Sequence, residues 1–313
     1  MTPLARNKRS AFRGSATVVL ALLSMALLAA GCGATASPAP RVASAATPEV
    51  TVPVAVPAAS STTARPKVVA IDPGHAADES GAAANGIVEK DSNLEMAWRV
   101  ARLLRAQGIE VVMTRTTDAR AGAPDGTPQP LGYNGTRLDL QARIEIANAA
   151  HADAFVSLHS NGLGDTNVRG YEVYYNSARP FAERNRVLAS AIFAGIGREL
   201  RAGGYADIPR AVIDDSCLKM FQGRCFPLFV LGSPRVMTRD EVYRRGGTPE
   251  ALGMAPDQPS ISSPATEMPG ALAELLFVSS PADAAMLQDE GAREALARGV
   301  TAGIVEFLGA DRG

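Results

Sequence analysis

The sequence is poor in residues on which several common kinds of protein chemistry depend. Its 313 residues include three cysteines, three histidines and one tryptophan, and aromatic residues make up 5% of the chain. No Cys-x-x-Cys pair occurs, which excludes zinc ribbons and thioredoxin-like redox sites. The net charge is −1, so charge gives no reason to expect a nucleic acid as partner.

The apolar run near the N-terminus is too short for a membrane-spanning helix. Residues 16–30 form a 15-residue run rich in Ala and Leu, whereas a span needs about 20 residues. Four basic residues and no acidic residue precede it: Arg6, Lys8, Arg9 and Arg13. This arrangement is typical of a secretory signal peptide, so we expect residues 1–31 to be removed and the protein to be exported to the cell envelope.

The end of this segment resembles the cleavage box of bacterial lipoproteins. It reads Leu28-Ala29-Ala30-Gly31-Cys32, with Ala29 where the pattern prefers Leu. We expect Cys32 to carry the lipid that anchors the protein to a membrane, facing the periplasm; plain cleavage with a free Cys32 is the alternative. Gly33 is not an acidic retention signal, which leaves the outer membrane open as the location. Cleavage would leave 27 basic and 32 acidic residues, a net charge of −5.

Two cysteines remain after Cys32 is assigned to the lipid. Export places Cys217 and Cys225 in an oxidising compartment, so we predict a disulfide between them. Two independent buried thiols are the alternative, because sequence alone does not show whether the geometry allows a bridge.

Composition divides the rest of the chain into a tether and one domain. Residues 32–66 are mostly Ala, Pro, Ser, Thr and Val, which predicts a disordered tether after the lipid-anchor cysteine. Residues 67–311 are predicted to form the catalytic domain. Within it, residues 232–269 are rich in Pro, Gly and charged residues and lack clear periodicity, so we interpret them as an insertion.

Short apolar strands alternate with helical patterns in this domain. A strand at 68–71, a helix at 92–107 and a strand at 109–114 form a βαβ unit, with Leu94, Trp98, Ala101 and Leu104 on the buried helix face. Later helices are predicted at 136–150 (capped by Thr136), 181–200 and within 281–308, and strands at 154–158, 170–175, 226–231 and 271–278. We predict an α/β fold, a single domain with a mixed, mostly parallel sheet and helices on both faces.

Two of the three histidines follow apolar strands. His75 comes after the first strand and His159 ends the strand at 154–158, while His151 is expected at the surface. Because the carboxyl ends of parallel strands meet at one edge, we expect His75, His159 and Glu89 to lie there together. Two histidines and a glutamate are a zinc-binding set. The plainer alternative is that the histidines are surface residues and that Glu89 only stabilises a helix N-terminus.

These residues belong to an ordered series of motifs. Ile71-Asp72-Pro73-Gly74-His75 is followed by Glu89-Lys90 with Asn93-Leu94, Thr114-Arg115, Arg143 with Ala147-Asn148, the segment ADAFVSLHSN at 152–161, GYEVY at 170–174 and AELLFVS at 273–279. In this order they resemble the zinc-dependent N-acetylmuramoyl-L-alanine amidases of the amidase-3 type, and the resemblance extends from residue 67 to about residue 310.

The resemblance implies an enzyme that hydrolyses the amide bond between N-acetylmuramic acid and L-alanine in peptidoglycan. His75, Glu89 and His159 would bind one Zn²⁺, and Glu274 would act as general base and then as general acid. Ser160 and Asn161 would orient a ligand or an imidazole, or only cap a turn. Peptidoglycan and a membrane are the expected partners, and the sequence does not identify a protein activator.

Two departures from the family leave alternatives open. Leu276 stands where the family commonly has Gly, and could narrow the site or shift the strand. Residues 232–269 are longer than the usual link, and either inhibit the enzyme as a lid or form a wall of the substrate site. The basic segment 235–245 would contact the acidic stem peptide or form a solvated face. A zinc peptidase or deacetylase on the same scaffold, and an inactive peptidoglycan-binding lipoprotein, are the alternative functions.

Overall fold

The computed structural model describes residues 65–123, 130–221 and 224–310. These described residues belong to one compact unit. The signal peptide, Cys32 and nearly all of the tether lie outside the described residues, so they stay predictions. Within the described ranges, the helices are all too short or too polar to cross a membrane.

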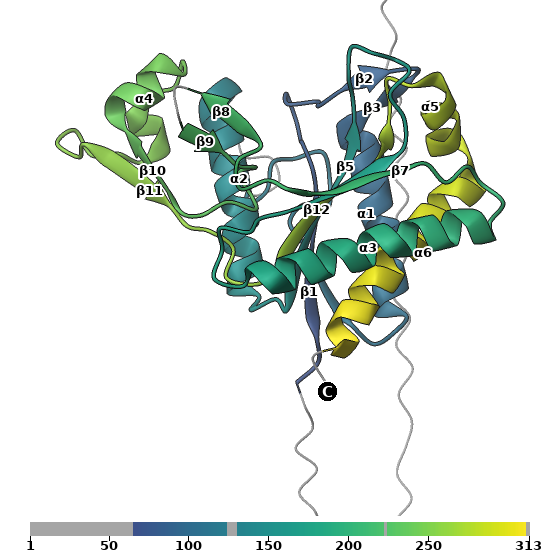
Figure 1. The fold of residues 1–313 in the computed structure, drawn as a ribbon. Helices are drawn as coiled ribbons and strands as arrows, with labels where there is room; N and C mark the ends of the chain where they lie inside the picture. The colour runs from purple at the N-terminus through teal and green to yellow at the C-terminus, as the bar shows by residue number, and fades with distance from the viewer. Residues whose placement is uncertain (1–64, 124–129, 222–223, 311–313) are drawn as a thin grey trace, which may run out of the picture. The chain divides into compact units, whose positions relative to one another are not determined.

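A six-stranded sheet forms the centre of the domain, in the order β4-β1-β5-β12-β6-β7 (Figure 1). Its strands are β1 (Val68–Pro73), β4 (Glu110–Met113), β5 (Ala154–Asn161), β6 (Tyr171–Tyr175), β7 (Pro209–Asp214) and β12 (Gly270–Phe277). Neighbouring strands are parallel except for the antiparallel pair β12 and β6. The predicted mixed, mostly parallel sheet is therefore confirmed, although β7 was not predicted because this edge strand is short and mostly half-exposed.

Alternating side chains of the strands fill two cores on opposite faces of the sheet. In β1, Val69 and Ile71 pack with α1 (Glu89–Arg105), α3 (Ala182–Ala202) and α6 (Glu290–Ala310), and the short α5 (Pro281–Gln288) lies against α6. Val68 and Ala70 pack on the other face with α2 (Gly132–Ala149). Because successive side chains of a strand point to opposite faces of the sheet, one strand contributes to both cores. Each core is covered by helices, which confirms the expected helices on both faces.

Helices α3 and α6 cross at glycines that allow their backbones to approach closely. A Cβ at Gly195 would lie 2.2 Å from the carbonyl oxygen of Gly299, and a Cβ at Gly303 would lie 2.4 Å from the backbone of Ile192. No side chain fits at these positions. The glycines, which weaken an isolated helix, are therefore explained by packing.

Two helix boundaries and one buried face differ from prediction. Helix α1 begins at Glu89 rather than Ser92, and α2 begins at Gly132, so Thr136 lies inside the helix and is not its cap. The prediction that Trp98 is a core residue is wrong, because its side chain is 42% exposed. Ala101 and Leu104 are buried as predicted and Leu94 is half-buried, and the buried face of α1 also carries Met96, Ala97 and Val100. His151 is exposed, as expected.

Between β7 and β12 the chain makes a long excursion, which we define as residues 215–269. It contains the hairpin β8 (Lys219–Phe221) and β9 (Arg224–Phe226), the pair β10 (Arg235–Thr238) and β11 (Ser260–Ser263), helix α4 (Arg239–Arg244) and the 3-10 helix η1 (Pro249–Leu252). The pair β10 and β11 lies beside α2 in Figure 1. The excursion has a small core of its own, formed by Met237, Val242, Leu252 and Met254.

The strand predicted at residues 226–231 is wrong. The strand β9 ends at Phe226, and the chain then turns. Val230 and Leu231 are buried against the face of the sheet that α2 covers. Their apolar character thus reflects burial of a turn, which a short apolar run cannot distinguish from a strand.

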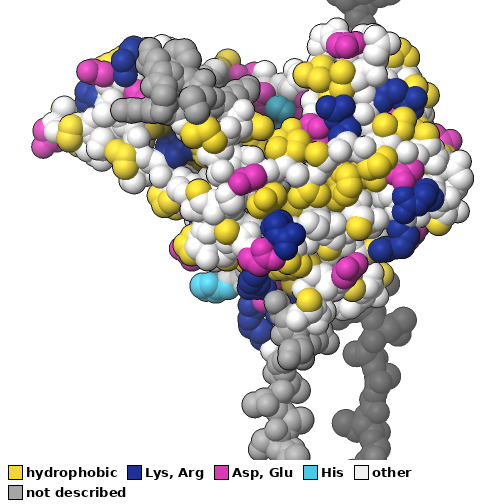
Figure 2. All heavy atoms as spheres, viewed as in Figure 1, with side chains coloured by type: hydrophobic (Ala, Val, Ile, Leu, Met, Phe, Trp, Pro, Cys, Tyr) yellow, Lys and Arg dark blue, Asp and Glu magenta, His cyan; other side chains and the backbone are white. Residues whose placement is uncertain are grey.

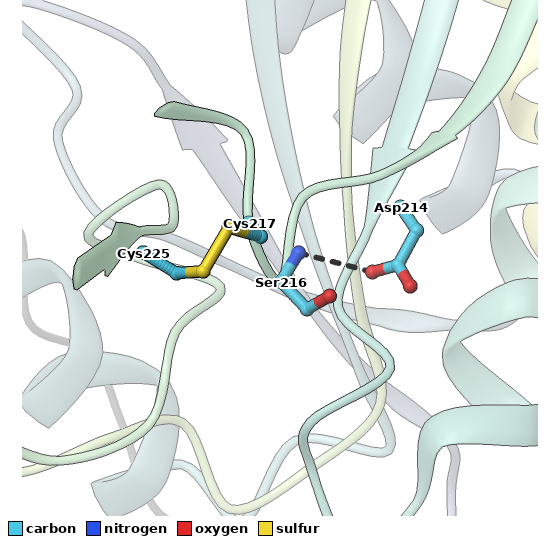
Figure 3. Close-up of a disulfide and its surroundings, with 4 residues drawn as sticks. All are labelled: Asp214, Ser216, Cys217 and Cys225. Carbon is cyan, nitrogen blue, oxygen red and sulfur yellow. Dashed lines mark hydrogen bonds between the residues drawn. A yellow bond between two sulfur atoms is a disulfide. The ribbon is translucent and has the colours of Figure 1, made fainter. Parts of the chain in front are cut away.

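The predicted disulfide between Cys217 and Cys225 is present, with Cα atoms 4.5 Å apart. Figure 3 shows it joining the segment after β7 to β9. Beside it, the backbone N–H of Ser216 donates a hydrogen bond to Asp214 Oδ1 (3.0 Å). The bridge therefore closes the first loop of the excursion.

Candidate active site

The loop after β1 presents His75 at the carboxyl edge of the sheet. His75 has a positive φ of 61°, a conformation that costs energy in a residue with a side chain. Three side chains hold the loop by its carbonyl oxygens. Arg115 Nε donates to Pro73 O (2.9 Å), Asn93 Nδ2 to Gly74 O (3.2 Å) and Arg143 Nη2 to His75 O (2.9 Å). The backbone strain at His75 is therefore compensated by hydrogen bonds from three different elements.

A buried ion pair lies directly beneath this loop. Arg143 Nη1 is 2.7 Å from Asp72 Oδ1, and Thr114 and Ser157 each donate a hydroxyl hydrogen bond of 2.6 Å to the same carboxylate. Burial raises the pKa of Asp72, but Arg143 and the two hydroxyls outweigh burial and hold this pKa below its ordinary value. Asp139 also pairs with Arg143, at 2.9 Å. The guanidinium that positions His75 is thus fully neutralised.

The predicted metal-ligating residues converge on one point. His75 Nε2 lies 2.9 Å from Glu89 Oε1, and His159 Nδ1 lies 3.0 Å from the same oxygen. The candidate ligand atoms of the three residues are all within 4.8 Å of one another. Glu89 is the first residue of α1, and its Oε2 accepts a hydrogen bond from the backbone N–H of Ala82 (2.8 Å), beside the small hairpin of β2 (Ala83–Ala84) and β3 (Ile87–Val88). Two imidazoles and a carboxylate at this spacing fit a divalent cation such as zinc.

Two glycines leave room for this cluster. A Cβ at Gly74 would lie 2.2 Å from the ring of His159. A Cβ at Gly81, which has a φ of +66°, would lie 2.5 Å from Glu89 Oε2. Any side chain at either position would displace a candidate ligand, so the close approach of the backbone is part of the site.

The charges in the cluster are strongly coupled. Burial lowers the pKa of His75, but hydrogen bonds to Glu79 and Glu89 outweigh it and raise the pKa to about 9. Burial likewise raises the pKa of Glu89, but His159 and His75 outweigh it and hold this pKa well below its ordinary value. Glu79 Oε2 lies 2.6 Å from His75 Nδ1, on the opposite side of the ring from Glu89. Carboxylates that bind the second nitrogen commonly orient metal-binding histidines.

Glu274 lies beside this cluster on the neighbouring strand. It is in register with His159 of β5 on one side and with Glu172 of β6 on the other. Its Oε2 is buried without a hydrogen-bond partner, and burial raises the pKa of Glu274 to about 7. A carboxylate with a pKa near neutrality can both take and return a proton. Its position and its chemistry make Glu274 the candidate general base beside the candidate metal site.

The other two predicted site residues point to different partners. Ser160 is buried, and its Oγ lies 3.0 Å from Ser92 Oγ of α1. Asn161 Nδ2 donates to Glu172 Oε1 (3.1 Å), which also accepts a hydrogen bond from Tyr174 Oη (2.6 Å). Neither side chain has a hydrogen bond to His75, Glu89 or His159 among the described residues. Asn161 therefore contacts the site only through Glu172, the residue that faces Glu274.

The two departures from the family pattern have structural counterparts. The register between β12 and β5 shifts between Glu274 and Phe277, and Leu276 is buried in the core rather than over the site. Within the described residues, the hydrogen bonds of segment 232–269 to the rest of the domain go mainly to α2, at Asn134, Arg137, Gln141 and Asn148, and none goes to the three candidate ligands. These contacts do not support an inhibitory lid.

Sequence reasoning missed the roles of the polar residues around the cluster. Arg115, Asn93 and Arg143 were quoted as parts of motifs, but nothing in their spacing shows that they bind the loop before His75. Glu79 lies four residues after His75 in a loop, and Glu172 lies on a strand whose partner was unknown. Only the tertiary contacts reveal these roles.

Comparisons with known proteins indicate the same enzyme family as the residues of the candidate site. A family model described as N-acetylmuramoyl-L-alanine amidase matches residues 69–218. The germination-specific N-acetylmuramoyl-L-alanine amidase of Bacillus subtilis is 34% identical over 122 residues, which cover 39% of this chain and 49% of that protein. The amidase AmiC of Neisseria meningitidis is 28% identical over 261 residues, covering 78% of this chain and 53% of that protein.

Over residues 69–218 the chain matches this amidase family. Its fold is shared with the CwlD amidase of Clostridioides difficile, solved in complex with the GerS lipoprotein, at a TM-score of 0.55 and 21% identity, over 78% of this chain and all of that one. The chain spans about half or less of the length of the first curated relatives that it matches. The family is generally metal-dependent, and His75, Glu89 and His159 form the candidate metal site here.

Proposed function

We propose that this protein is an exported, zinc-dependent N-acetylmuramoyl-L-alanine amidase that cleaves peptidoglycan between N-acetylmuramic acid and L-alanine. One observation carries the proposal: His75 and His159 converge on Glu89, and Glu274 lies beside His159 across the sheet. The match of residues 69–218 to the amidase family model and the similarity to curated amidases support the substrate and the bond.

The protein's own residues divide the work of amide hydrolysis. Zinc, when held by His75, Glu89 and His159, would supply Lewis acidity to the amide carbonyl and to water. Glu274 takes the proton of the attacking water and then delivers it to the leaving nitrogen, because an amine leaves poorly unless it is protonated. Glu79 holds the far nitrogen of His75 and so fixes the ring orientation.

Cell-wall digestion with product analysis tests the proposal. The wild-type protein, with bound zinc measured by mass spectrometry, is expected to release peptides with a free amino group on L-alanine. Glu274→Gln is expected to keep zinc and lose about 10²–10⁴-fold in rate, the usual size of an acid–base contribution. Glu267→Gln, a change of the same kind at an exposed position, serves as control and should retain activity.

Other outcomes identify the alternatives. Cleavage within the stem or release of acetate would indicate a peptidase or a deacetylase and contradict the amidase assignment. A wild-type protein that holds zinc but digests no wall would indicate a binding role.

The proposed location is the cell envelope, through a lipid on Cys32. Metabolic labelling with a fatty acid is expected to mark the wild-type protein and not the Cys32→Ser variant. Labelling that persists in the variant, or that is absent from both, would contradict lipid attachment at this residue.

A further inference from the structure

A cavity of about 660 Å³ lies between the N-terminal half of α2 and the excursion. Most of its lining is apolar, including Leu140, Leu228, Phe229, Pro234 and Met237. Three arginines also line it: Arg137 from α2, Arg235 from β10 and Arg245 from the end of α4. Glu241 is the single acidic residue in this lining. The cavity therefore combines an apolar wall with an excess of positive charge.

Arg137 is buried without a carboxylate partner among the described residues. Arg137 is only 5% exposed. Its Nη2 donates a hydrogen bond to Ser263 Oγ, and its guanidinium lies 4.4 Å from the centre of the Phe229 ring. Its Nη1 is buried and has no hydrogen-bond partner. A buried, unpaired guanidinium N–H is costly, and an incoming acceptor would remove that cost.

Arg235 repeats the arrangement from the other side of the cavity. Its guanidinium lies 5.0 Å from the centre of the same Phe229 ring, and its Nη2 donates to Pro227 O. Burial lowers the pKa of Arg137 and of Arg235, and the positive charge of Arg245 acts in the same direction on both, while the Asp215 carboxylate acts against it at Arg235. The guanidinium groups thus repel one another, which an anion placed between them would relieve.

Glu241 forms no ion pair with these arginines among the described residues. Its carboxylate accepts a hydrogen bond from the backbone N–H of Thr238 (3.3 Å), and the hydroxyl of Thr238 accepts from the backbone N–H of Glu241. This reciprocal pair caps helix α4. The acidic side chain in the lining is therefore already used to begin a helix.

Helix α2 links the cavity to the catalytic edge. Arg137 precedes Arg143 by six residues, which is about 9 Å along a helix. Arg143 in turn binds the carbonyl oxygen of His75. The cavity and the loop that carries His75 are therefore contacted by arginines less than two turns apart on one helix.

We propose that this cavity binds a free carboxylate of the peptide stem, with Arg137, Arg235 and Arg245 as donors and the ring of Phe229 as apolar support. Arginine suits this role because its planar donor fork matches a carboxylate and stacks on aromatic rings. The identity of the peptide rests on the proposed function. The ligand class, a carboxylate with apolar groups beside it, rests on the cavity itself.

Calorimetric titration of the full-length zinc-loaded protein with a synthetic stem peptide tests the binding site without catalysis. The peptide with free carboxylates should bind at least about 10-fold more tightly than its fully amidated counterpart, the size expected for hydrogen bonds to a charged group. Arg245→Gln and Arg235→Gln should abolish that difference. Arg245 is exposed, so its substitution is expected to change stability by no more than about 0.5 kcal/mol, and misfolding does not obscure the result.

Arg244→Gln is the matched control. Arg244 is the last residue of α4, directly before Arg245, and it is exposed and lies outside the cavity lining. The same loss of charge at Arg244 should therefore leave the preference for free carboxylates intact. Equal binding of the two peptides by the wild type, or an equal effect of Arg244→Gln and Arg245→Gln, would overturn the proposal. Inorganic phosphate or tetraglutamate binding as tightly as the stem peptide would show a general anion site and would also overturn it.

Kinetics on soluble muropeptides separates this proposal from the catalytic one. If the proposed function holds, the cavity variants should lower kcat/KM for the free-carboxylate substrate only, by about 10-fold. If the wild type cleaves neither substrate, the amidase proposal fails, while the titration still decides whether the cavity binds the carboxylate.

Discussion

The catalytic edge of the sheet and the excursion each bury an arginine of helix α2, under opposite electrostatic conditions. At the edge, Arg143 is paired with Asp72 and Asp139. Beside the excursion, Arg137 has an aromatic ring and a hydroxyl but no carboxylate among the described residues. The first arginine is neutralised within the fold and supports a loop, whereas the second retains a buried donor without a partner.

The comparison teaches that burial of an arginine does not define its role. A neutralised guanidinium is a structural element, because all its charge is compensated by the protein. A buried guanidinium without a carboxylate partner can still be structural when carbonyl oxygens take its N–H groups, as they do for Arg115, whereas Arg137 keeps a buried N–H without any partner. The surface supports the contrast, since on the face shown in Figure 2 side chains of both signs are interspersed without a broad basic patch.

The largest expected effect is at the catalytic edge. Arg143→Met should lower the free energy of unfolding by about 3–5 kcal/mol, because it leaves the buried carboxylate of Asp72 without its partner. Urea unfolding of the metal-loaded protein measures this. Arg198→Met, at an exposed position of α3, should change stability by no more than about 0.5 kcal/mol. A small effect at Arg143 would break the distinction between the two arginines.

Removing the disulfide should loosen the excursion and leave the edge intact. Cys217 and Cys225 are eight residues apart, and a bridge of this loop size contributes about 2–3 kcal/mol in the chain-entropy account. In the double variant to Ser, amide hydrogen exchange should accelerate in the excursion, and bound zinc should stay unchanged. Loss of zinc would show that the two regions are not independent.

The base of the excursion should make stability depend on pH. Asp215 is fully buried, and burial raises its pKa to about 6 although Asn176 and the backbone N–H of Leu228 donate to it. Because the folded state then binds the proton more tightly than the unfolded state, the contribution is present below about pH 4 and is lost as the pH rises through 6. Unfolding at pH 4.5 and 7 should differ by up to about 2 kcal/mol from this group, and Asp215→Asn should remove that part of the difference. An unchanged pH dependence in the variant would contradict the assignment.

The smallest expected effect is at Arg137. Arg137→Met should change the free energy of unfolding by no more than about 1 kcal/mol, because it removes a buried charge that has no carboxylate partner while keeping much of the side-chain volume. Unfolding measured beside Arg143→Met gives the direct contrast. A loss as large as that of Arg143→Met would show that Arg137 is structural.

Much of the sheet and the candidate metal set could be predicted from sequence. Apolar runs of the right length identified β1, β5, β6 and β12, and strand ends placed His75 and His159 at one edge. The approach of Glu89 was predicted from the same reasoning and the family resemblance. Edge strand β7 was not predicted, and the buried turn after β9 was predicted as a strand. An apolar run does not show whether its backbone is hydrogen-bonded to a neighbouring strand.

The sequence by itself determined the α/β class, the order of the main strands and the residue types able to hold a metal, because periodicity and strand ends are local properties. The pair of Asp139 and Arg143 is a local contact four residues apart on one helix, whereas only the tertiary structure decided that Asp72 also pairs with Arg143. Arg137 and Arg143 are the same residue type on one helix, and their difference depends on Asp72, Phe229 and Ser263, which come from distant parts of the chain. Electrostatic pairing depends on distances between such parts, and local sequence does not encode them.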